Sequence, residues 1–313
     1  MQTFVSVLLF TVGLFFTVKG GDSFVSAATR ISARFGIPQF VIGATVVSIA
    51  TTLPEIIVSL LSAADGKTAM AVGNAVGSVT ANTGLIMALS IFFLPQPCKG
   101  KSDRLRCLIM LLMCACLLAF SRSGSFGALG GVCLFFLLTI FIFDSVRLAK
   151  SESSHKSDQN GKLFHDIFGF TIGAAGIIIG ARLLVDNATI LARSIGVSEA
   201  LISVTVIAIG TSLPELVTTL TAIKKRQASL SLGNIIGANI IDTAVILPSC
   251  AILSGKELPI SAQSLYYDIP VCFFITAIAV IPTLISRKFL KIQGILMLLI
   301  YIAYIIFICI KGV

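Results

Sequence analysis

Apolar runs of about 18 or more residues recur along the whole chain, and that length suits a membrane-spanning helix. Only 12% of the 313 residues are charged, whereas a soluble domain is nearer 25%, and the mean hydropathy is +1.02. We therefore predict an all-α polytopic membrane protein whose partner is the lipid bilayer. The net charge of +9 does not indicate nucleic-acid binding, because the basic residues lie between apolar runs, as the cytoplasmic flanks of membrane helices do.

Charged residues, glycines and prolines divide the apolar sequence into ten predicted spans. One plainly polar linker, residues 149–163, separates a first half (1–148, spans one to five) from a second half (164–313, spans six to ten). The apolar N-terminus has no basic leader and is predicted to be a retained helix, not a signal peptide. The spans are 2–18 (to 35 if the helix continues), 39–63, 68–94, 107–121, 126–148, 164–194, 198–223, 228–254, 266–285 and 289–310.

The distribution of basic residues predicts the orientation of these spans. If the N-terminus is outside, 17 of the 23 Lys and Arg residues fall on the inward side. Cytoplasmic loops carry an excess of Lys and Arg. We therefore predict that both termini lie outside and that the linker is cytoplasmic.

The two halves repeat each other. When the numbering is shifted by 160, residues 36–86 match 196–246 without a gap at 15 of 51 positions, including Leu-Pro-Glu at 53–55 and 213–215 and Gly-Asn at 73–74 and 233–234. Because each repeat holds five spans, an odd number, the copies enter the membrane in opposite directions. Inverted repeats of this kind are typical of secondary transporters, which bind their substrate at the midplane between the copies.

Three carboxylates fall near the middle of predicted spans: Glu55, Glu215 and Asp242. A charged side chain at the bilayer centre costs roughly 2.5–3.5 kcal/mol. No Lys or Arg lies in the central turns of spans two, three, seven or eight. The carboxylates are therefore either protonated or neutralised by cations, and both alternatives indicate ion or proton transport.

The prolines and hydroxyls of the same motifs supply further oxygens. A helical proline removes the hydrogen bond to the carbonyl four residues earlier, so Pro54 and Pro214 are predicted to free the carbonyls of Ala50 and Gly210. Carboxylate, carbonyl and hydroxyl oxygens suit hard cations such as Na⁺ and Ca²⁺ and not soft metals. The hydroxyls of the two motifs belong to Thr51, Thr52, Thr211 and Ser212.

Spans three and eight carry GNAVGSVTAN and GNIIGANIID. Their glycines form GxxxG patterns, which are typical of close helix packing. Beside them runs a polar stripe at i, i+4 and i+8, which is one face of a helix. The stripe consists of Asn74, Ser78 and Asn82 in span three, and of Asn234, Ala238 and Asp242 in span eight.

These motifs resemble the alpha repeats of the calcium/cation antiporter superfamily, and within it the prokaryotic sodium/calcium exchangers. The resemblance implies ten helices in two inverted halves, with Na⁺ and Ca²⁺ competing at overlapping central sites and long first and sixth helices that slide. It implies that Glu55 and Glu215 are the shared carboxylates. The other oxygens that it implies come from Thr51, Thr52, Thr211, Ser212, Ser78, Asn82, Asp242 and the backbone carbonyls of Ser48 and Ala208.

Two positions depart from the family pattern. Ala238 stands where the pattern has serine, which removes a hydroxyl from one Na⁺ site, and Ala50 stands where the motif usually has glycine. The proton-coupled branch of the superfamily has a pattern that resembles G-N-x-x-E in spans three and eight. This chain has Gly77 and Gly237 at the position of that glutamate. The motifs therefore favour Na⁺ coupling.

The leading hypothesis is a Na⁺/Ca²⁺ antiporter that works by alternating access as a monomer in a prokaryotic inner membrane, with no cofactor. The alternatives are a proton-coupled exchanger of Ca²⁺ or another divalent cation, and a cation channel. An intramembrane enzyme with Glu55 and Glu215 as acid and base lacks a nucleophile or cofactor motif. The eight cysteines show no metal-ligand spacing.

Overall fold

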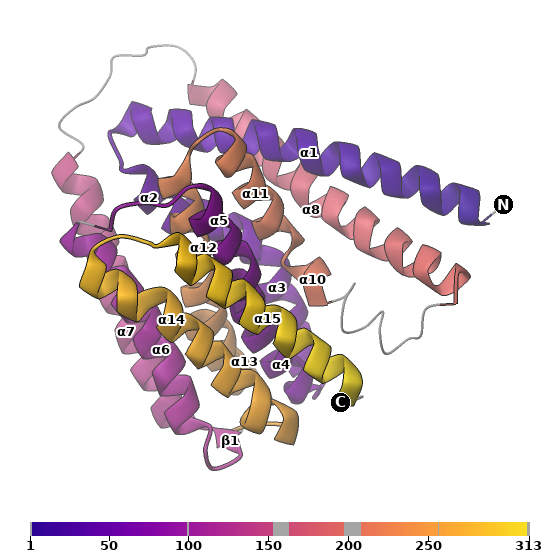
Figure 1. Ribbon diagram of the computed structural model, residues 1–313, viewed down its shortest axis with the longest axis vertical. Coiled ribbons are helices and arrows are strands. Elements are labelled where there is room, and N and C mark those ends of the chain that lie inside the picture. Colours follow the sequence, from indigo (N-terminus) through magenta and orange to yellow (C-terminus); the bar gives the residue numbers. More distant parts are fainter. Residues whose placement is uncertain (1, 99, 153–162, 197–207, 256, 312–313) are drawn as a thin grey trace.

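The computed structural model describes residues 2–98, 100–152, 163–196, 208–255 and 257–311. These residues form a helical bundle with two short strands (Figure 1). The helices of the first half are α1 (Gln2–Phe35), α2 (Gln39–Ile42), η1 (Gly43–Val47), α3 (Ser48–Ala64), α4 (Thr68–Ala81), η2 (Asn82–Met87), α5 (Ala88–Phe93), α6 (Lys101–Phe120) and α7 (Ala128–Glu152), where η marks a π-helical segment.

The described elements of the second half follow a similar order. Its helices are α8 (Leu163–Ser194), α10 (Ala208–Thr211), α11 (Leu213–Lys224), α12 (Ala228–Ile241), η4 (Asp242–Ile246), α13 (Leu247–Ser254), η5 (Ser264–Asp268), α14 (Ile269–Ser286) and α15 (Lys291–Lys311).

Within the described residues, eight helices are long and apolar enough to cross a membrane. Of the ten predicted spans, the fourth and the seventh are not among them. The fourth corresponds to α6, which begins at Lys101, earlier than the predicted 107, and carries charged residues in its first turns. The start of the seventh lies outside the described residues. Helix α1 runs unbroken to Phe35, so the longer alternative for the first span is correct.

Helices α1 and α8 lie side by side along one edge of the bundle (Figure 1). Their glycines bring the two backbones together. A Cβ placed on Gly20 would lie 2.8 Å from the carbonyl oxygen of Gly173, and one placed on Gly180 would lie 2.7 Å from that of Gly13. This is the small-residue packing that membrane helices use in place of a hydrophobic driving force.

Helix α12 is the most enclosed element of the described bundle, because nearly all its residues are buried. Its GxxxG glycines pack on the beginning of span two. A Cβ placed on Gly233 would lie 2.3 Å from the Phe40 carbonyl oxygen, and one placed on Gly237 would lie 2.5 Å from that of Ala44. The packing role predicted for these glycines is confirmed for the second copy and wrong for the first, where a Cβ placed on Gly73 or Gly77 would meet none of the described residues within 4 Å.

We expect Gly233→Ala to lower the free energy of unfolding by about 1–3 kcal/mol, because the added methyl group would overlap a backbone atom that has no rotamer to relieve it. Thermal unfolding of the detergent-solubilised protein measures this. Gly131→Ala is the matched control, since its Cβ would meet only Pro248 Cβ at 3.8 Å. Equal stability of the two variants would contradict the close contact.

Two small backbone pairings join loops of opposite halves. Strand β1 (Ser125–Phe126) pairs antiparallel with β2 (Leu258–Pro259). At the other end of α6, Pro97 forms a bridge with Lys288, and the Cys98 amide donates to the Arg287 carbonyl at 2.8 Å. The loop between spans three and four and the loop between spans four and five are thus each paired with a loop of the second half.

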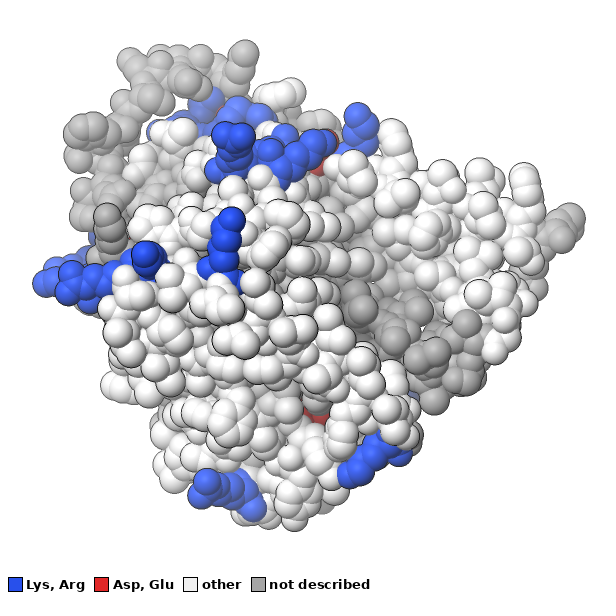
Figure 2. Space-filling view, in the orientation of Figure 1, with Lys and Arg blue, Asp and Glu red and all other residues white. Residues whose placement is uncertain are grey.

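Three of the described ion pairs join α1 to the second half of the chain. Asp166 of α8 contacts Arg30 and Arg34 of α1 at 2.6 and 3.4 Å, and Lys225 contacts Asp22 at 3.4 Å. Lys and Arg gather mainly in the upper part of the molecule in Figure 2, with a few at the lower edge and a broad uncharged band between. The uncharged band fits a protein surface that faces the hydrocarbon core of a membrane.

One further ion pair is buried. The Arg106 guanidinium is fully buried, lies 3.0 Å from an Asp144 carboxylate oxygen, and stands 5.2 Å from the centroid of the Phe40 ring. It therefore connects α6 and α7 to the start of span two.

Candidate cation site

The two Leu-Pro-Glu motifs meet in the interior of the bundle. The Thr52 hydroxyl of α3 donates to a Glu215 carboxylate oxygen of α11 at 3.1 Å. The neighbouring Thr51 hydroxyl lies 3.2 Å from the Asn234 side-chain oxygen of α12 and 3.3 Å from the Ser48 carbonyl oxygen. Residues that lie far apart in the sequence are thus brought together across the repeat.

The three central carboxylates are buried and lack basic partners. Glu55 and Glu215 are 1% exposed, and Asp242 is 0% exposed. Both oxygens of Glu55, both of Asp242 and one of Glu215 have no hydrogen-bond partner. Within the described part of the chain, no Lys, Arg or His lies within 4.0 Å of any of them.

These carboxylates also interact with one another. Glu55 and Asp242 each experience the charge of Glu215. Like charges in a low-dielectric interior repel strongly, and an unpaired buried charge costs several kcal/mol. The three carboxylates are therefore stable in this interior only when protons or a bound cation neutralise their charge.

Other predicted site residues supply buried oxygens without a partner. These belong to the Ser78 and Ser212 hydroxyls and to the Asn82 side-chain oxygen. Thr211 is the last residue of α10 and is half-buried. Ala208 begins α10, so its carbonyl lies on the same short helix. The Ser48 hydroxyl donates to the Thr45 carbonyl at 3.0 Å, which leaves the Ser48 carbonyl as its contribution to the site.

The backbone around the two prolines differs between the copies. In the second copy the helix is interrupted at Ser212, between α10 and α11, two residues before Pro214. In the first copy Pro54 lies inside an unbroken α3, and the irregular stretch is the upstream π-helical segment Gly43–Val47. The proline therefore interrupts the helix in one copy only.

A feature that the sequence did not indicate is the π-helical geometry of spans three and eight. Asn82 begins one π-helical segment and Asp242 begins the other, and these residues are equivalent in the repeat. A π-helical turn shifts the helix register and is frequent at functional sites. Asn82 and Asp242 therefore stand at the point in each copy where the helix register changes.

The carboxylates do not form a compact metal centre on their own. Among the described residues, no group of three or more His, Cys, Asp or Glu side chains could hold a metal ion. Any cation at this site must therefore also draw on hydroxyl, amide and carbonyl oxygens, as Ca²⁺ commonly does. All eight cysteines are free.

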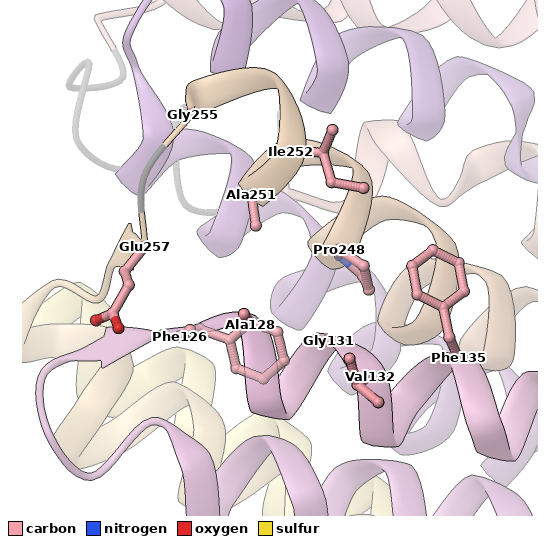
Figure 3. Close-up of a pocket in the computed structure, with 11 residues that line it drawn as sticks. Phe126, Ala128, Gly131, Val132, Phe135, Pro248, Ala251, Ile252, Gly255 and Glu257 are labelled. Atoms are coloured by element: carbon pink, nitrogen blue, oxygen red, sulfur yellow. The ribbon is translucent and has the colours of Figure 1, made fainter.

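A pocket elsewhere in the protein has the opposite chemistry. A crevice of about 430 Å³ lies between the start of α7 and the end of α13, and apolar residues such as Phe126, Val132 and Ile252 line it, with Glu257 at its rim (Figure 3). None of the candidate cation ligands lines this crevice.

An all-α membrane fold with unpaired carboxylates in its interior defines a membrane transport protein for cations. The family model described as sodium/calcium exchanger protein matches residues 5–146 and 165–310. The chain therefore belongs to the sodium/calcium exchanger family, and it is a cation antiporter and not an enzyme.

Individual relatives support this assignment. The inner membrane protein YrbG of Escherichia coli (strain K12) is 36% identical over 274 residues, covering 83% of this chain and 84% of that protein. The sodium/calcium exchanger MaX1 of Methanosarcina acetivorans is 30% identical, covering 96% of this chain and 98% of its own length. The likeness thus extends over both halves of the chain.

A solved structure of the sodium-calcium exchanger NCX_Mj, soaked with Na⁺ and Sr²⁺, superposes on this chain with a TM-score of 0.84. The two are 31% identical, and the match covers 97% of this chain and 99% of that one. The predicted fold class, ten membrane helices in two inverted five-helix repeats, is confirmed, and the protein is an integral membrane protein.

Proposed function

We propose that this chain exchanges Na⁺ for Ca²⁺ by alternating access, with the ions bound between the two Leu-Pro-Glu motifs. The observation that carries the proposal is the set of unpartnered carboxylate oxygens on Glu55, Glu215 and Asp242, all buried and without a basic neighbour in the described chain. Buried charge of this kind marks ion pathways in membrane proteins.

Each residue of the site has a proposed role. Glu55 and Glu215 are shared by Ca²⁺ and Na⁺, because they come from opposite halves, and Thr52, one turn before Glu55 on α3, donates to Glu215. Asn82 and Asp242 act as a second pair at the π-helical segments. Hydroxyls and carbonyls complete the coordination, and they belong to Thr51, Thr52, Thr211, Ser212, Ser78, Ser48 and Ala208.

The membrane context forms part of the same proposal. The excess of basic residues on one side favours a cytoplasmic linker at 149–163, with both termini outside. We place the protein in a prokaryotic inner membrane, where it works as a monomer whose two halves, 1–148 and 164–313, are the inverted repeats.

Transport by the purified protein in proteoliposomes tests the proposed coupling. We expect uptake of radioactive Ca²⁺ when Na⁺ is loaded inside and absent outside, and little uptake when Na⁺ is equal on both sides. Uptake driven by a pH gradient and indifferent to Na⁺ would instead identify a proton-coupled exchanger. Uptake that needs no counter-ion gradient would identify a channel.

A further inference from the structure

Two asparagines occupy equivalent positions in the inverted repeat but make different hydrogen bonds. Asn74 of α4 and Asn234 of α12 are separated by the repeat shift of 160 residues, as are Ser59 and Thr219, and Glu55 and Glu215. A symmetric molecule would give both asparagines the same partners. The difference between them therefore reports how the two halves differ in conformation.

Asn74 contacts its own half. Its side-chain nitrogen donates to the Ser59 hydroxyl at 2.9 Å and lies 3.5 Å from the Glu55 carbonyl oxygen. Asn74 is only half-buried. In this half, the polar groups next to the glutamate are hydrogen-bonded to each other.

Asn234 contacts the opposite half. Its side-chain oxygen accepts from the Thr51 hydroxyl at 3.2 Å, while its side-chain nitrogen has no partner and the residue is 0% exposed. Thr219, the equivalent of Ser59, is also 0% exposed, and its hydroxyl has no partner. A donor and a hydroxyl that are bonded in one half are thus both unsatisfied in the other.

Unsatisfied buried polar groups destabilise the state that contains them. In an inverted-repeat transporter, one repeat rocks or gates against the other around a fixed site, so each repeat can take in one access state the conformation that its partner has in the other. The Asn74 arrangement of one state is then adopted by Asn234 in the other. That exchange gives the Asn234 amide and the Thr219 hydroxyl the partners that they lack here.

We propose that Asn74 and Asn234 are positioning residues that exchange hydrogen-bond partners between the two access states. In the present state Asn74 binds Ser59 and Asn234 binds Thr51. In the other state Asn234 donates to the Thr219 hydroxyl and to the Glu215 carbonyl, and releases Thr51. Thr51 is a proposed ion ligand, so its release changes the site when access changes.

The present state has its cytoplasmic side closed, given the proposed orientation. The first half of α12 is buried, and Gly233 abuts the Phe40 carbonyl at the cytoplasmic end of span two. The inference rests on the alternating access of the proposed function. It adds the residues that define each state.

Two variants should shift the balance of states in opposite directions. Ser59→Ala removes a hydrogen bond of the present state, and Thr219→Val removes one of the other state. A net hydrogen bond shifts an equilibrium about five-fold. Ser59→Thr and Thr219→Ser keep a hydroxyl at each position and should therefore keep the wild-type balance of states. If these side chains acted only through packing, retaining the hydroxyl would not preserve that balance.

Hydrogen–deuterium exchange of the full-length protein in nanodiscs, without Na⁺ or Ca²⁺, measures this balance independently of transport. The readout is the exchange of residues 228–241 relative to that of 68–81. We expect Ser59→Ala to raise this ratio, because it favours opening around α12, and Thr219→Val to lower it. Shifts in the same direction, or no shift in either variant, would overturn the proposal.

Failure of the proposed function has a different signature. If Na⁺ drives no Ca²⁺ flux in the wild-type protein, the assigned coupling is wrong, yet the exchange ratios still decide whether the asparagines swap partners. If the wild-type protein transports, the same variants should change the ratio of half-saturating Ca²⁺ inside and outside during Ca²⁺ self-exchange, about five-fold and in opposite directions.

Discussion

Glu215→Gln is expected to lower the initial rate of Na⁺-driven Ca²⁺ uptake by at least about a hundred-fold. The amide has the size of the carboxylate and can still accept from Thr52, so the loss would report the missing charge. A charge-assisted interaction is worth up to about 3 kcal/mol, and a hundred-fold change corresponds to about 2.7 kcal/mol. Uptake by reconstituted vesicles measures it.

Glu257→Gln is the matched control for this prediction. Glu257 is exposed and accepts from the Ser125 hydroxyl at 2.5 Å, between the paired loops. We expect its variant to transport at close to the wild-type rate. Wild-type transport by Glu215→Gln, with the fold intact, would place the ion site elsewhere.

Asp144→Ala is expected to lower the free energy of unfolding by about 3–5 kcal/mol, because removing one partner of a buried ion pair leaves the other charge uncompensated. Arg106 is fully buried, and Asp144 is its acidic partner, with the Asp144 side chain 14% exposed. Asp144 also accepts from the Ser102 hydroxyl at 2.8 Å. Unfolding in detergent, followed by circular dichroism, gives the change.

Two further variants separate a buried charge from a lost contact. Asp22→Ala removes one partner of a partly exposed ion pair with Lys225 and should cost less than about 1 kcal/mol. The double variant Arg106→Met with Asp144→Leu should recover most of the stability, since it removes both charges. A double variant as unstable as Asp144→Ala would show that shape, and not charge, matters there.

The repeat and the apolar runs predicted much of the fold because they depend on local pattern. The long first helix, the inverted halves and the close packing of Gly233 and Gly237 all follow from features that are visible in the residues themselves. The start of α6 could not be predicted in this way. Its polar first turns are stable inside the bundle only because Asp144 of α7 neutralises Arg106.

The candidate site was predicted in its composition but not in its geometry. Glu55, Glu215 and Asp242 stand out in any apolar sequence, and the repeat indicated that their motifs meet. The π-helical turns at Asn82 and Asp242 and the contact between Thr51 and Asn234 depend on how neighbouring helices pack. Such turns have no residue signature of their own, so only the folded chain reveals them.

The backbone ties at the two ends of α6 bear on how the protein can move. Pairing of β1 with β2, and of Pro97 with Lys288, joins loops of one half to loops of the other at both ends of α6. Any rearrangement of the two halves must keep these loops paired or break the backbone hydrogen bonds that join them. Helices α1 and α8 lie outside both pairings, so a displacement of these two helices would leave both pairings intact.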